Sequence, residues 1–236
     1  MSDIRRASEL FPPLTAAGGP LRRLPPDLRP ASLLWHVVMG VDSSPNLELW
    51  LNALESFPPQ DVRGVFDGRG DAAYSACQLA TSQLWMNEFV KPPEQRDWPV
   101  VERVLERAYQ VGESLGLEPL TTAAAANRIV VLADYLKSMP AALDLAQRSL
   151  ASERTSLSVL VIAESMGKQL YFQSRKDEAA VWLRRAVAVE TTAFPHMLMQ
   201  AYIYLSDCVC DVDPSEALRL AEAGTAIVRD TRIPVV

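Results

Sequence analysis

The chain has 236 residues, a formal net charge of −6, and a composition of 49% hydrophobic and 22% charged residues. This balance is typical of a globular protein and argues against a wholly disordered chain. The acidic charge, and the lack of any Lys/Arg run longer than a pair, argue against a nucleic-acid-binding protein. The excess of arginine over lysine and the many alanines indicate a GC-rich, bacterial genome.

The cysteines and the first apolar segment indicate the cellular compartment of the protein. Cys77, Cys208 and Cys210 are too few for a disulfide framework, and free thiols are typical of a reducing compartment. The apolar run at 31–41 is interrupted by His36 and is too short to span a bilayer. Prolines and arginines precede this run, which argues against a signal peptide. We therefore expect a cytoplasmic protein that does not enter a membrane.

The N-terminal part of the chain is rich in prolines and glycines. Proline lacks an amide donor and fixes φ, so residues 1–30 are predicted to form an irregular tail or arm. Short helices are expected at 31–41 and between Pro45 and Phe57, followed by a flexible joint at the glycines 64, 68 and 70. Residues 31–70 are thus expected to cap the region that follows.

Apolar spacing and proline positions predict an all-α fold from residue 71 onward. Five prolines lie where a first helical turn is expected, a position that tolerates proline because its amide has no intrahelical partner. No segment alternates between apolar and polar residues as a strand does. The predicted helices span 71–90, 99–115, 119–137, 140–152, 156–173, 176–190, 195–211 and 214–230.

Small and apolar residues recur at positions 0, +4 and +7 of four helices, on one helix face. They let neighbouring helices approach closely. The triplets are Val104/Ala108/Val111, Ala142/Ala146/Ser149, Ala179/Leu183/Ala186 and Ala217/Ala221/Gly224. Their first members lie 37 or 38 residues apart. Such a period is typical of a solenoid, in which each helix pair buries its apolar face by stacking on its neighbours.

The segment 160–190 resembles the tetratricopeptide repeat family. Gly167 lies where that family has a helix-packing glycine, and Ala179, Leu183 and Ala186 match its second-helix pattern. The departures are a spacing above the family's roughly 34 residues and three substituted positions, Ala163, Leu170 and Thr191. The resemblance implies that residues 71–236 form a right-handed α-solenoid of antiparallel helix pairs, with a concave groove lined by the first helix of each pair.

No stretch of the sequence carries a catalytic, cofactor or metal signature. His36 and His196 lack a second ligand three or four residues away. The glycines between 64 and 70 lack the Gly-Lys-Ser/Thr ending of a phosphate loop. Cys77 has no histidine nearby in sequence and is expected to be a small buried side chain. We therefore expect no enzyme, no cofactor and no metal.

The resemblance implies that a partner lies against the first helices of the pairs. The residues carried over to that face are Asn127, Arg128, Tyr135, Glu164, Lys168, Tyr171, Tyr202 and Ser206. Glu164, Lys168 and Tyr171 share a face by their i, i+4, i+7 spacing alone. An alternative interpretation of Glu164 and Lys168 is a solvated i, i+4 ion pair without a binding role.

The leading functional prediction is a non-catalytic scaffold or adaptor that binds a partner peptide or helix in the groove. The alternative is a regulatory sensor domain that binds a small molecule or a signalling peptide. An enzyme with catalytic residues dispersed over several helices is the third interpretation. The expected partner is a protein or peptide, and self-association of the chain is left open.

Overall fold

The computed structural model describes residues 45–55, 58–66, 70–151, 155–191 and 194–231. Every regular element within these ranges is helical, as the sequence predicts. The predicted tail at 1–30 and helix at 31–41 lie outside the described residues. Contacts divide the chain into two compact units, Met1–Ala124 and Ala125–Val236, and each is considered by itself.

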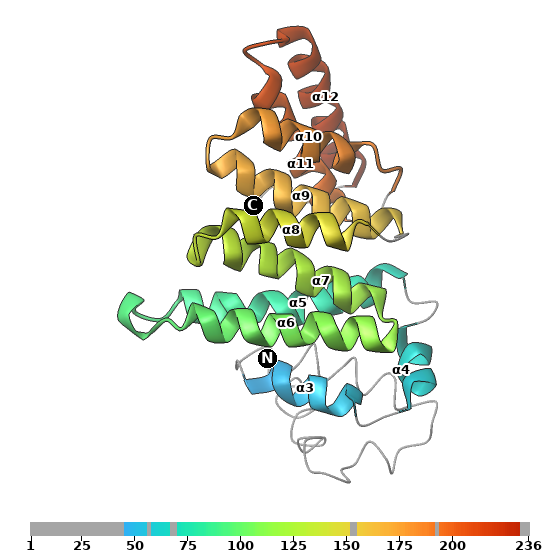
Figure 1. Cartoon of the computed structure of the whole chain (residues 1–236). Helices are drawn as coiled ribbons and strands as arrows, with labels where there is room; N and C mark the ends of the chain where they lie inside the picture. Colours follow the sequence, from blue (N-terminus) through green and yellow to red (C-terminus); the bar gives the residue numbers. More distant parts are fainter. Residues whose placement is uncertain (1–44, 56–57, 67–69, 152–154, 192–193, 232–236) are drawn as a thin grey trace, which may run out of the picture. The chain divides into compact units, whose positions relative to one another are not determined.

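Figure 1 labels the helices in chain order. The described part of the first unit contains α3 (Pro45–Glu55), α4 (Pro59–Phe66), α5 (Gly70–Phe89), the short 3-10 helix η2 (Pro93–Gln95), α6 (Trp98–Leu115) and the start of α7 (Glu118–Val130). The second unit contains the end of α7, the π-helical segment η3 (Val131–Tyr135), α8 (Met139–Ser149), α9 (Ser156–Phe172), α10 (Lys176–Val187), α11 (Pro195–Val209) and α12 (Pro214–Thr231). The boundary between the units therefore lies inside α7 and inside the predicted repeat domain.

The eight helices predicted from residue 71 onward are confirmed, with ends within a few residues of the expected positions. Each of the five prolines used to place them lies at the first or second position of its helix. Asp97 caps α6, since its side chain accepts a hydrogen bond from the Val100 amide at 3.1 Å. Thr155 caps α9 in the same way, accepting from the Ser158 amide at 3.3 Å.

The predicted flexible joint is wrong over residues 59–66, which form α4. Pro59 begins this helix, in the position where proline is preorganised for a helical turn. The Arg63 side chain donates a hydrogen bond to the Leu115 carbonyl at 2.7 Å, at the C-terminal end of α6. A cation is favourable at that end of a helix, and this contact fixes α4 on α6.

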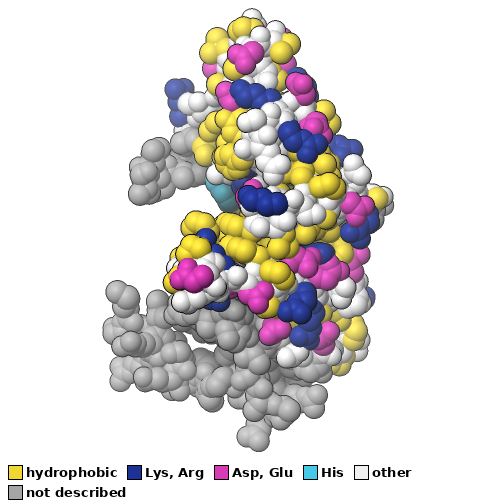
Figure 2. Space-filling view, turned by 60° about the vertical axis from the view of Figure 1, so that its left-hand side comes forward, with side chains coloured by type: hydrophobic (Ala, Val, Ile, Leu, Met, Phe, Trp, Pro, Cys, Tyr) yellow, Lys and Arg dark blue, Asp and Glu magenta, His cyan; other side chains and the backbone are white. Residues whose placement is uncertain are grey.

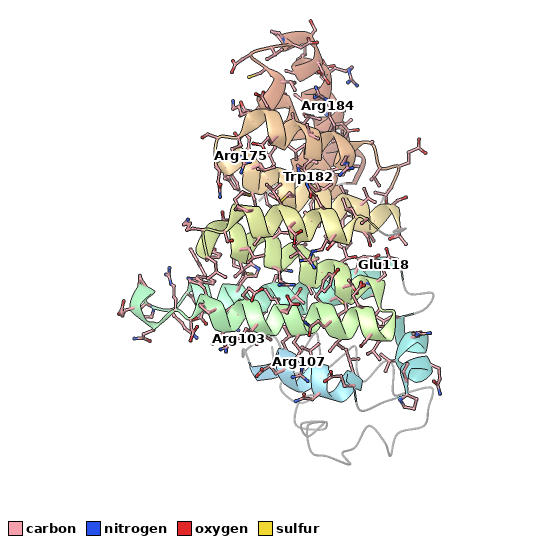
Figure 3. The ribbon with its side chains drawn as sticks, in the orientation of Figure 1. Arg103, Arg107, Glu118, Arg175, Trp182 and Arg184 are labelled. Atoms are coloured by element: carbon pink, nitrogen blue, oxygen red, sulfur yellow. The ribbon has the colours of Figure 1, made fainter. Side chains whose placement is uncertain are left out.

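In the first unit, α6 packs on α3, α4 and α5. Its buried residues include Val101, Leu105, Ala108 and Gly112, which recur every three or four positions and form the apolar stripe of an amphipathic helix. On the side of α6 toward α3, Arg107 binds the Glu55 carboxylate and the Asn52 amide oxygen (Figure 3).

The α6–α7 hairpin depends on a glycine. A Cβ atom at Gly112 would lie 2.5 Å from Thr121 Oγ1 and 2.7 Å from the Thr121 amide nitrogen, well inside van der Waals contact. The two helices can approach this closely only because position 112 has no side chain. Gly116 then ends α6 with φ +66°, and the Leu117 amide donates to the Gly112 carbonyl at 2.8 Å.

The predicted helix 119–137 changes form before it ends. Residues 131–135 make the π-helical turn η3, in which the Leu136 amide donates to the Val131 carbonyl, five residues back. Lys137 follows with φ +54°, the left-handed conformation that reverses the chain into α8.

The α9–α10 pair in the second unit carries the close contact that the tetratricopeptide resemblance predicts. A Cβ atom at Gly167 would lie 2.6 Å from the Leu183 Cγ atom, so the glycine lets Leu183 of α10 lie directly on α9. Leu183, Ala179 and Ala186 are all fully buried. The hairpin turns at Ser174, which has φ +59°.

The next pair, α11 and α12, also has a close helix contact at a glycine, which here lies on the second helix of the pair. A Cβ atom at Gly224 of α12 would lie 3.0 Å from the Tyr202 Cβ atom of α11. Ser206 of α11 donates a hydrogen bond to the Ala217 carbonyl of α12 at 2.8 Å. Adjacent helices of this unit therefore pack as pairs, which is compatible with a helical repeat fold. Among the described helices, none has the length and apolar character needed to cross a bilayer.

Candidate functional site

Three aromatic rings meet where α9 ends and α11 passes it. The centroids of Tyr171 and Tyr204 lie 4.9 Å apart, and Phe172 lies 5.7 Å from each of them. These separations are those of favourable aromatic pairs. Phe172 is nevertheless 58% exposed. The aromatic cluster of Tyr171, Phe172 and Tyr204 thus places a large apolar side chain on the surface.

Asp207 fixes the polar edge of the aromatic cluster. Two hydrogen bonds hold the pKa of Asp207 below its usual value. The larger effect comes from the Tyr171 hydroxyl and the next from the Lys176 ammonium. The bond to Asp207 also raises the pKa of Tyr171. The Lys176 ammonium lies 3.2 Å from an Asp207 carboxylate oxygen. Asp207 therefore links the ends of α9, α10 and α11, and it holds the Tyr171 ring against Tyr204.

Glu164 is buried rather than solvated. Its side chain is 0% exposed, and neither carboxylate oxygen has a hydrogen-bond partner that meets normal geometry. The Lys168 ammonium lies 3.2 Å from one oxygen, and 25% of the Lys168 side chain is exposed. Burial raises the pKa of Glu164, and Lys168 only partly offsets this effect. The interpretation as a surface ion pair is therefore wrong for Glu164.

Further polar groups adjoin Glu164 and Lys168. With its amide nitrogen turned toward Asp134 of η3, Gln169 donates to both carboxylate oxygens, at 2.8 and 2.6 Å. Burial raises the pKa of Asp134 despite the nearby charges of Lys137 and Lys168. The pKa of His196, at the start of α11, is lowered mainly by burial and to a smaller extent by the charge of Lys168. Groups from η3, α9 and α11 thus surround the Lys168 ammonium.

The burial of the Glu164 carboxylate predicts how the stability of the protein depends on pH. The pKa of Glu164 is raised above its ordinary value of 4.5, so this group loses stabilising free energy as the pH rises above 4.5. We expect Glu164→Gln to increase the free energy of unfolding by about 1 kcal/mol near pH 7.5, because a buried carboxylate without hydrogen bonds costs more than a buried amide. The partly exposed Lys168 can still be hydrated when its partner is removed. This advantage should shrink toward pH 5, where Glu164 is increasingly protonated in both states.

Urea unfolding of parent and variant across this pH range measures the difference. The two proteins must be compared at each pH, because His196 also makes the stability of both depend on pH, in the opposite direction. The pKa of His196 is lowered, so the protein loses stability as the pH falls below 6.5. The pKa of Asp134 is raised like that of Glu164, so its effect on stability has the same direction, and Asp134 is present in both proteins. A difference that stays constant with pH would contradict the burial of the Glu164 charge.

The structure separates the predicted partner-binding residues into three groups. Asn127, Arg128 and Glu164 are buried, so a partner on the surface does not reach them. Tyr202 and Ser206 lie at the α11–α12 contact. The remaining three are partly exposed: Tyr135, Lys168 and Tyr171. Of all eight, only Tyr171 belongs to the aromatic cluster.

Sequence reasoning missed Phe172, Tyr204, Lys176 and Asp207. The aromatic residue predicted on α11 was Tyr202, but Tyr204 lies two residues further along the helix, which corresponds to about 200° of rotation. Tyr204 and Asp207 are three residues apart and therefore share a face. That spacing, with a carboxylate one turn after an aromatic, was the signal available in the sequence.

The surface and the comparisons add no catalytic assignment. Figure 2 shows basic and acidic side chains interspersed with apolar ones on the face it displays. Among the described residues, no three His, Cys, Asp or Glu side chains converge as a metal ion requires.

No protein-family model, no curated protein and no solved structure matches the chain.

Proposed function

We propose that this protein is a non-catalytic adaptor, built as a tetratricopeptide-like helical array, which binds a segment of a partner protein through the aromatic cluster. The observation that carries the proposal is the exposure of Phe172 beside two further rings. Aromatic residues are enriched at protein interfaces and dominate their energetics. The three free cysteines support placing this adaptor in the cytoplasm.

The surroundings of the aromatic cluster favour an apolar anchor on the partner. Lys176 is paired with Asp207, and Arg175 is paired with Glu178 at 2.6 Å, so the charges at its edge are largely matched. Matched charges leave burial of Phe172 as the main favourable term on binding. Tyr171 and Tyr204 support the Phe172 ring from the protein side, which limits the entropy lost when a partner covers it.

The test measures how a partner's affinity depends on these rings. A partner retained by the tagged protein from a host extract is purified, and its Kd is measured for the parent, Phe172→Ala and Tyr204→Ala. Each truncation is expected to weaken binding by about 2 kcal/mol or more, roughly thirtyfold in Kd. Helicity should be unchanged, since Phe172 is mostly exposed.

Leu218→Ala is the matched control. Leu218 lies on α12 of the same unit and is 63% exposed, so its truncation removes a similar apolar surface away from the aromatic cluster. Binding by this variant should equal that of the parent. A partner bound equally well by the Phe172 and Tyr204 variants would refute the proposed surface. If the parent retains no partner at all, the adaptor function itself is refuted.

A further inference from the structure

A separate pocket lies between α8 and α10, away from the residues of the aromatic cluster. It has a volume of about 460 Å³ and is lined by Gln147, Leu150, Ala151, Val181, Trp182 and Arg185. The volume falls within the range typical of small-molecule sites. Four of the six lining residues are apolar, and the two polar ones, Gln147 and Arg185, come from opposite helices.

Arg185 differs from its neighbours in having no acidic partner among the described residues. Arg184, the preceding residue, lies 3.2 Å from Glu216, and Arg148 of α8 lies 2.9 Å from Asp144. Within the described part of the chain, Arg185 forms no ion pair, and its guanidinium carbon lies 5.4 Å from the centre of the Trp182 ring. An arginine stacked on an aromatic ring is held in place with its donors still available to an anion.

We propose that this pocket binds a small aromatic carboxylic acid. The apolar walls formed by Leu150, Val181 and the Trp182 ring suit a flat hydrocarbon body. The guanidinium of Arg185 suits a carboxylate, which it can bind through two parallel hydrogen bonds. The Gln147 amide, on the facing helix, can donate a third.

The recognition chemistry excludes other ligand classes. A cationic ligand would meet Arg185 as a like charge, and a neutral one would form no hydrogen bond between opposite charges with it. A phosphorylated sugar has no flat apolar body to cover Val181 and Trp182. The site is independent of the aromatic cluster, so the two proposals stand or fall separately.

Titration calorimetry on the full chain tests the inference with three probes: phenylacetate, 3-phenylpropionate and indole-3-acetate. At least one is expected to bind at a single site. Its neutral amide should bind about tenfold more weakly or worse, because the charge-assisted hydrogen bonds are lost. Arg185→Gln should weaken the acid by a similar factor.

Arg184→Gln is the matched control, because it removes the same charge one residue away on α10 (Figure 3). Arg184 does not line the pocket, so the affinity should stay that of the parent. An equal loss in both variants would show a diffuse charge effect and overturn the site. Failure of all three acids to bind at millimolar concentration would overturn it too, as would an amide that binds as well as its acid. Tighter binding of a peptide ending in phenylalanine than of 3-phenylpropionate would overturn the assignment to a free acid.

Discussion

Replacing Gly112 by alanine is expected to lower the free energy of unfolding by about 2–3 kcal/mol. The new methyl carbon would lie 2.7 Å from the Thr121 backbone nitrogen and 3.1 Å from its Cα atom. Backbone atoms cannot rotate away as a side chain can, so α6 and α7 must move apart. Thermal or urea unfolding of the purified variant measures the loss.

Gly64→Ala is the control for the intrinsic effect of the substitution. Gly64 is also helical, in α4, but a Cβ atom there has no heavy atom within 4 Å. This change should stabilise the protein by up to about 1 kcal/mol, because alanine favours the helix more than glycine does. Equal effects of the two substitutions would contradict the close α6–α7 contact.

The second large effect is expected at the α9–α10 contact. Gly167→Ala should cost about 2 kcal/mol, because its methyl group would lie 2.6 and 2.8 Å from the Leu183 Cγ and Cδ2 atoms. Leu183→Ala alone should cost about 3 kcal/mol, since Leu183 is fully buried. In the double variant, the two side-chain atoms nearest to the new methyl group are gone.

The two substitutions should therefore be strongly non-additive. The cost of Gly167→Ala is expected to fall by about 1 kcal/mol or more when Leu183 is already alanine. It should not vanish, because the Leu183 amide nitrogen still lies 3.3 Å from the position of the new carbon. Additive costs in this double-mutant cycle would mean that Gly167 and Leu183 are not in contact.

Most helix positions could be predicted from the sequence because the signals are local. An apolar spacing of three and four residues indicates the helices after residue 71, and a proline in the first turn marks the start of five of the eight. Neither signal refers to the rest of the chain. The prediction failed at α4, where glycines at 64, 68 and 70 indicated a loop. Gly64 is instead inside a helix that Arg63 fastens to the end of α6. A tertiary contact of this kind is not visible in local sequence.

The candidate site was harder to predict because it depends on how each helix is rotated. Tyr171 was identified because its face follows from spacing within α9. On α11 the face toward α9 carries Tyr204, whereas Tyr202 packs on α12. Both tyrosines are compatible with the same helical pattern, so only the contacts with neighbouring helices distinguish them. The burial of Glu164 likewise follows from the packing around α9.

The way the helices of the second unit pack has a consequence for how this unit folds. α9 packs on α10, α11 packs on α9 and α10, and α12 packs on α11, so the main contacts join elements that are near in sequence. Only short loops must close before such contacts form, which keeps the entropic barrier low. Assembly can begin at the α9–α10 hairpin and extend helix by helix toward α12. Folding of this kind is fast and does not wait for distant parts of the chain to meet.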